Sequence, residues 1–164
     1  MLLPPSAILA ERIAQIQQTL PPSVRLIAVT KQVESAVIRA AYVAGLRDFG
    51  ENRVQEAIAK QLQLQDCPGI TWHLIGHLQS NKVQKALGHF QWIHSVDSLK
   101  LADQLNHLAT DLSQPPCICL QVKILPDPNK YGWTVPQLLA DLATLNQYTH
   151  LDICGLMTIP TPLV

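Results

Sequence analysis

The sequence lacks an excess of charge of either sign, because 12 lysine and arginine residues balance 12 aspartate and glutamate residues. Proteins that bind nucleic acids through bulk charge show a basic excess, so this composition argues against a nucleic-acid partner. No apolar run approaches the roughly 18–20 residues that a membrane span requires, and we expect no membrane partner. Apolar residues still make up 48% of the chain. Disorder, which needs low hydrophobicity and high net charge, is therefore excluded.

Cysteine patterns typical of zinc or redox motifs are also missing. None of the four cysteines forms a C-x-x-C pair, and none lies near a histidine at zinc-finger spacing. Because Cys117 and Cys119 lie in an apolar run, we interpret them as buried thiols in a reduced compartment. The first residues have no basic segment followed by a long apolar core, so they do not resemble a signal peptide. We expect a cytoplasmic protein.

What the sequence does contain is an alternation of short apolar runs and longer segments with helical spacing of apolar residues. The short runs predict buried strands, and the longer segments predict helices. The expected strands cover residues 25–30, 46–49, 71–75, 92–96, 118–124 and 151–159, and the expected helices cover 7–19, 34–44, 53–64, 81–87, 99–112 and 135–146. Repeated alternation of this kind predicts consecutive βαβ units and a parallel sheet.

Two architectures fit this pattern, an open doubly wound sheet and a (β/α)8 barrel. A doubly wound sheet that binds nucleotides has a glycine-rich turn after its first strand, but here that strand ends in Val29, Thr30 and Lys31. We therefore predict an α/β fold of the (β/α)8 barrel type, with residues 1–164 as a single domain. The chain holds only six βα units, whereas a typical barrel takes about 250 residues. We expect an incomplete barrel whose open edges favour self-association.

Active sites of such barrels lie at the carboxyl ends of the strands, which selects a short set of residues. Lys31 ends the first expected strand, where its amine either acts as a Schiff-base nucleophile or lies free in solvent. The segment 51–53 follows the second strand and is equally typical of an ordinary helix start. Histidines at the ends of the next two strands, and a methionine at the end of the sixth, are either site residues or core residues. These further candidates are Asn52, His73, His94 and Met157.

Six segments together form a recognisable series: residues 29–31, 49–56, 72–82, 93–98, 130–132 and 155–160. Their order and spacing, over about residues 7–160, resemble the YggS-like pyridoxal-phosphate homeostasis proteins. The resemblance implies a fold similar to the barrel domain of bacterial alanine racemase. It implies that pyridoxal 5′-phosphate is held as a Schiff base on Lys31, and that Asn52, His73, His94 and Met157 line the cofactor. It also implies a monomer that buffers or delivers the cofactor without defined catalytic turnover.

The resemblance stops before strands seven and eight of the family, whose loops hold the cofactor phosphate. Without those loops, the phosphate loses charge-assisted hydrogen bonds worth roughly 1.5–3 kcal/mol each. One alternative is therefore a shortened relative that no longer binds the cofactor. Another is a pyridoxal-phosphate-dependent racemase or decarboxylase, although enzymes of this barrel type need a second, β-rich domain for which the chain has no length.

Overall fold

The computed structural model describes residues 5–125, 127 and 129–160. The strands are β1 (Ala28–Val29), β2 (Asp48–Glu51), β3 (Thr71–Leu74), β4 (Trp92–Val96), β5 (Cys117–Lys123), β6 (Trp133–Thr134) and β7 (Asp152–Met157). The helices are α1 (Pro5–Thr19), α2 (Ser35–Val43), α3 (Val54–Gln63), a 3-10 turn η1 (Ser80–Lys82) that leads into α4 (Val83–Leu87), α5 (Leu99–Leu108) and α6 (Val135–Leu145). Among the described residues, no helix is long and apolar enough to cross a membrane.

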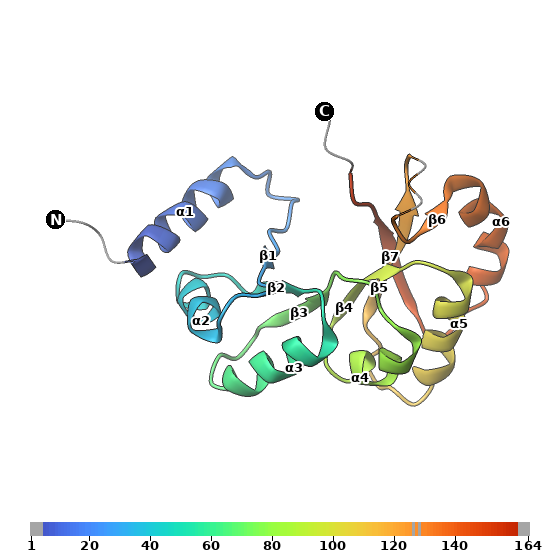
Figure 1. The fold of residues 1–164 in the computed structure, drawn as a ribbon, viewed down its shortest axis with the longest axis horizontal. Coiled ribbons are helices and arrows are strands. Elements are labelled where there is room, and N and C mark those ends of the chain that lie inside the picture. Colours follow the sequence, from blue (N-terminus) through green and yellow to red (C-terminus); the bar gives the residue numbers. More distant parts are fainter. Residues whose placement is uncertain (1–4, 126, 128, 161–164) are drawn as a thin grey trace.

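All strand pairs are parallel, and the sheet runs in the order β1-β2-β3-β4-β5-β6, with β7 also paired to β5. A helix follows each of β1 to β4, as right-handed βαβ crossovers require. Figure 1 shows α2 to α6 following the sheet in chain order. The prediction of an α/β fold of barrel type, present in part, is confirmed. Whether the chain forms a single independent domain stays a prediction.

The two faces of the sheet differ in what they pack against. Phe49, Leu74 and Ile93 are fully buried and belong to the hydrophobic core beneath the helices. Their neighbours along the strands point to the opposite face, because side chains alternate along a strand. On that opposite face, residues that are paired from one strand to the next form a row across the sheet. The row consists of Val29, Gly50, His73, Trp92, Cys117 and Asp152. We call this the inner face.

Some expected elements are shorter in the structure, and one observed strand was not expected. The first strand covers only Ala28–Val29, since the residues before it make no ladder. The fifth helix ends at Leu108 instead of residue 112, and the Thr110 hydroxyl donates to the carbonyl of His107 in its last turn. The short β6 was missed, because two residues carry no periodic signal.

The cysteines were only partly interpreted correctly. Cys67 and Cys119 are buried, but Cys117 is half-buried and Cys154 is exposed. The reason lies in β7, which pairs only with β5 among the described strands and so leaves its inner-face side chains without a cover. An apolar run predicts a strand, but it does not tell which strand lies at an edge of the sheet.

Candidate functional site

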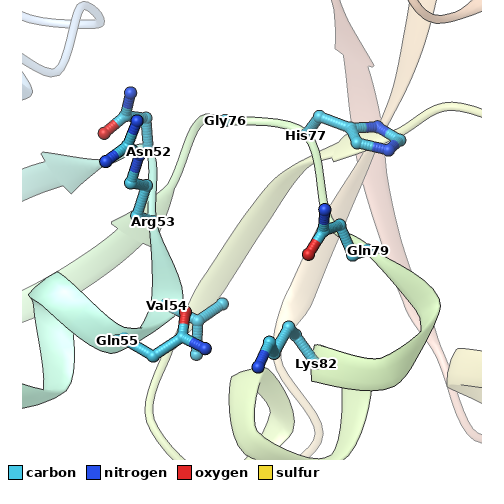
Figure 2. Close-up of a pocket in the computed structure, with 8 residues that line it drawn as sticks. All are labelled: Asn52, Arg53, Val54, Gln55, Gly76, His77, Gln79 and Lys82. Atoms are coloured by element: carbon cyan, nitrogen blue, oxygen red, sulfur yellow. The ribbon is translucent and has the colours of Figure 1, made fainter.

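A pocket of about 310 Å3 lies where β2 and β3 end. Figure 2 shows that residues following β2 form one side and residues following β3 form the other: Asn52, Arg53, Val54, Gln55, Gly76, His77, Gln79 and Lys82. The lining contains two cations and no carboxylate, so the pocket favours anionic groups. The Arg53 guanidinium lies 2.9 Å from Glu56, while among the described residues no carboxylate pairs with Lys82.

The backbone after β3 passes directly over Asn52. A Cβ added to Gly76 would lie 2.3 Å from the carbonyl oxygen of Asn52 and 2.6 Å from its Cα, so only glycine fits there. The Ser95 hydroxyl donates to the Gly76 carbonyl at 2.5 Å, which ties this loop to β4. Within this packing, the side-chain Oδ1 of Asn52 is buried and has no hydrogen-bond partner. A buried acceptor without a donor is costly, and this one is therefore suited to a ligand.

Lys31 lies in a tight turn immediately after β1. Its neighbour Gln32 has φ 60, a left-handed conformation that non-glycine residues rarely adopt. The turn is held at Thr30, whose N–H donates to the carbonyl of Gly50 at 2.9 Å and whose carbonyl accepts from Val33 at 3.0 Å. Lys31 itself is exposed. It comes two residues after Val29, which belongs to the inner face; that its amine shares this face stays a prediction.

Glu51 is not at the mouth of the barrel, where the sequence analysis grouped it with Asn52 and Arg53. It is fully buried on the helix side, with Oε1 2.7 Å from the ammonium of Lys60 in α3. The Thr30 hydroxyl donates to the same oxygen at 2.6 Å, and Lys60 also donates to the Thr30 carbonyl at 2.8 Å. This ion pair therefore joins the ends of β1 and β2 to α3, directly behind Lys31. Alternation from Gly50 is the signal that could have placed Glu51 there.

His73 and His94 form a hydrogen-bonded chain with Asp48 across the inner face. The Nε2 of His73 lies 2.9 Å from Asp48 Oδ1, and its Nδ1 lies 2.9 Å from the Nε2 of His94. Because a carboxylate only accepts, His73 donates to Asp48 from Nε2, and His94 donates from Nε2 to the Nδ1 of His73. The Nδ1 of His94 is then an acceptor. The expectation that both histidines end their strands was wrong, since each lies within its strand.

The environment keeps this pair uncharged. Burial lowers the pKa of His73, although hydrogen bonding to Asp48 opposes the change. Burial also lowers the pKa of His94 to about 4, and the neighbouring His73 contributes in the same direction. The indole of Trp92 stacks beside both rings, with centroids 5.9 Å from His73 and 5.6 Å from His94. The inner face therefore carries a fixed pair of neutral imidazoles at neutral pH.

The structure brings only some of the predicted site residues together. His73 and His94 touch, and Asn52 extends the strand next to His73. Met157 is the last residue of β7, as expected, and pairs with Gln121 of β5. No hydrogen bond or ring contact among the described residues joins Lys31 or Met157 to the other three. Lys31 follows β1 and Met157 ends β7, and each of these two strands has one partner in the described sheet.

His77 and Tyr131 form a second part of the site that the sequence analysis did not assign. Their rings stack with centroids 3.7 Å apart and 11° between planes. The His77 Nδ1 also lies 2.8 Å from Asp97 Oδ2. The pair fixes the loop after β3 against the loop before β6. Both residues fall in segments that carried the family resemblance, which was the available signal.

Comparison with known proteins identifies the family. The profile of the alanine racemase N-terminal domain matches residues 6–161. The chain belongs to this family. It is 52% identical over 146 residues to the pyridoxal phosphate homeostasis protein of Synechocystis sp., covering 89% of this chain and 67% of that one. Its identity to the protein of the same name from Pseudomonas aeruginosa is 44% over 142 residues, covering 87% and 61%. The predicted resemblance is confirmed.

Solved structures agree with the fold. PipY of Synechococcus elongatus without pyridoxal phosphate superposes with a TM-score of 0.91 at 56% identity, over 95% of this chain and 73% of PipY. The structure of PipY with pyridoxal phosphate bound gives 0.90 at 54% identity, over 95% and 72%. An alanine racemase of Clostridium difficile gives 0.74 at 15% identity, over 93% and 42%, which shows the shared fold alone. The chain thus spans about two thirds of the length of its curated relatives.

Proposed function

We propose that the chain binds pyridoxal 5′-phosphate in cofactor homeostasis, with the cofactor held as a Schiff base on Lys31. The observation that carries the proposal is the unpartnered, buried Oδ1 of Asn52 beside the strand that Lys31 follows. The same fold in PipY, 54% identical to this chain, has been crystallised with pyridoxal phosphate bound. Relatives whose sequences match most of this chain are named pyridoxal phosphate homeostasis proteins.

The chemistry of the described residues fits this cofactor. The Lys31 amine supplies the nucleophile: its nitrogen bonds to the aldehyde carbon, and the aldehyde oxygen leaves as water. Asn52 offers an acceptor to the hydroxyl of the cofactor ring. His73 and His94, whose pKa values burial lowers, line the inner face as uncharged groups. Arg53 and Lys82 attract an anionic ligand toward this end of the sheet.

We further propose that the protein has no defined catalytic turnover. Its partner is the cofactor alone, without nucleic acid or membrane, and it acts in the cytoplasm. The relatives' names describe homeostasis and not a reaction. In the described part of the chain, the inner-face histidines are already engaged with Asp48 and with each other. This arrangement leaves them as positioning groups. Met157 is proposed to line the cofactor from β7.

A titration of the chain with pyridoxal 5′-phosphate, followed by visible absorption, tests the proposal. We expect a Schiff-base absorption band that saturates, and its loss in Lys31→Ala. The matched control is Lys100→Ala, since Lys100 is an exposed lysine of α5. An equal band in Lys31→Ala and Lys100→Ala would contradict the assignment of Lys31. No saturable band at all would favour the shortened relative that does not bind, and alanine racemisation that depends on Lys31 would favour the enzyme.

A further inference from the structure

A second cluster of reactive side chains lies on β5 and β7, several strands away in the sheet order from β1 and β2, which Lys31 and Asn52 follow. Cys117 is the first residue of β5 and Asp152 is the first residue of β7. The two residues pair directly in the parallel ladder, and Figure 1 shows their strands side by side. They share a register row of the inner face with Val29 and Gly50. Strands β3 and β4 lie between this pair and β1 and β2 in the sheet order, and the cluster contains none of the proposed cofactor residues.

Cys154 adds a third side chain to this pair. It comes two residues after Asp152, and alternate residues of a strand share a face. Its Sγ lies 3.5 Å from the Asp152 carbonyl oxygen. Ile118 pairs with Ile153 and the next pair joins Cys119 to Gly155, so the ladder skips Cys154. The Cys117 Sγ lies 3.3 Å from Asp152 Oδ2.

The ligand atoms of these three residues all lie within 4.8 Å of one another. A tetrahedral zinc ion with Zn–S bonds of about 2.3 Å and Zn–O bonds of about 2.1 Å holds its ligand atoms roughly 3.4 to 3.8 Å apart. The distance of 3.3 Å between Cys117 and Asp152 is already close to this separation. The Cys154 side chain is exposed, so rotation about its Cα–Cβ bond is open to it. The paired strands have therefore brought three ligand side chains together.

We propose that Cys117, Asp152 and Cys154 form a binding site for a thiophilic divalent cation such as Zn2+, with the fourth position left to water. Two thiols and one carboxylate favour zinc over magnesium or calcium, which prefer all-oxygen sites. On binding, each thiol forms a bond to the metal and releases its proton to solvent, so two protons leave for each ion bound. The site goes beyond the cofactor function and does not depend on it.

Cobalt titration tests the site directly, because thiolate ligands give Co2+ a strong charge-transfer absorption in the near ultraviolet. The titration uses the full chain with a non-thiol reductant and no added pyridoxal phosphate. We expect the band to saturate at one cobalt for each chain and to disappear when Zn2+ is added. We expect Cys154→Ser and Cys117→Ser to weaken cobalt binding at least tenfold, and Asp152→Asn to weaken it severalfold.

Matched controls separate this site from other thiols and from the cofactor site. Cys67→Ala and Cys119→Ala remove buried thiols outside the cluster and are expected to keep the band. Lys31→Ala is also expected to keep it, so failure of the metal site and failure of the cofactor site are distinguishable. Circular dichroism checks that each variant folds. An unchanged band in Cys154→Ser, or no saturable band in the unmodified chain, would overturn the proposal.

Discussion

The imidazoles of His73 and His94 are hydrogen bonded to each other across β3 and β4, with Nδ1 of the first 2.9 Å from Nε2 of the second. Asp48 completes the chain from β2 and fixes the tautomer of His73. Three neighbouring strands therefore contribute one side chain each to a single polar row on the inner face. These hydrogen bonds fix which ring nitrogen of each histidine carries the proton. The Nδ1 of His94 is then the last acceptor of the hydrogen-bonded series.

The first prediction concerns the pH dependence of stability. Burial lowers the pKa of His94 to about 4 in the folded protein, against about 6.5 in the unfolded chain. The unfolded state therefore binds the proton first, and the free energy of unfolding falls as the pH drops from about 6.5 to 4. We expect a loss on the order of 2–3 kcal/mol from this group. Urea unfolding at several pH values measures it, and His94→Gln is expected to have a shallower slope. An identical slope in that variant would contradict the assignment.

The second prediction concerns Gly76. We expect Gly76→Ala to lower the free energy of unfolding by about 2–3 kcal/mol, because the added methyl group meets the backbone of Asn52. Gly88→Ala is the matched control, since its nearest neighbour atom would lie 3.8 Å away. Urea unfolding of the two variants compares them. Equal effects would mean that the close approach of Gly76 does not constrain this loop.

The third prediction concerns the buried ion pair behind Lys31. Lys60→Met leaves Glu51 as an uncompensated buried charge, and we expect it to cost about 3–5 kcal/mol of unfolding free energy. The double variant Glu51→Gln with Lys60→Met is expected to recover much of this loss. The exposed pair of Arg53 and Glu56 is the control, and breaking it is expected to cost about 0–1 kcal/mol. A double variant no more stable than Lys60→Met would show that the charge is not the cause.

The fourth prediction concerns self-association. Val29 of β1 is 53% exposed and Leu156 of β7 is 67% exposed, and both belong to strands with a single partner in the described sheet. Unpaired edges with apolar side chains favour edge-to-edge contacts. Light scattering is expected to show oligomers that decrease in Leu156→Lys but not in Leu62→Lys, a similarly exposed leucine on α3. A monomer at high concentration would contradict this.

The sequence predicted much of the fold because buried parallel strands and amphipathic helices leave strong periodic signals. The helix expected over residues 135–146 is α6, with Pro136 in its first turn, and the structure adds a capping box of Thr134 and Gln137 at its start. The edges were harder to predict, since the expected strand over residues 25–30 forms ladder pairs only at Ala28 and Val29. The same limit applies to Cys154, whose exposure depends on the position of β7 in the sheet.

The site was predicted at the level of strands but not of side-chain partners. Alternation predicts Lys31 on the face of Val29, and this stays a prediction, whereas His73 and His94 lie inside their strands and bond to each other. Contacts of this kind depend on register, which a single sequence does not specify. The pairing of Cys117 with Asp152, more than thirty positions later, is hidden for the same reason.

The covalent bond that we propose between Lys31 and the cofactor can be tested directly. Incubation with pyridoxal 5′-phosphate, reduction with borohydride and peptide mapping identify the lysine that carries the adduct. We expect the adduct on Lys31, formed well before any other lysine reacts. Slow labelling spread over several lysines would contradict the account and would favour a shortened relative that has lost cofactor binding.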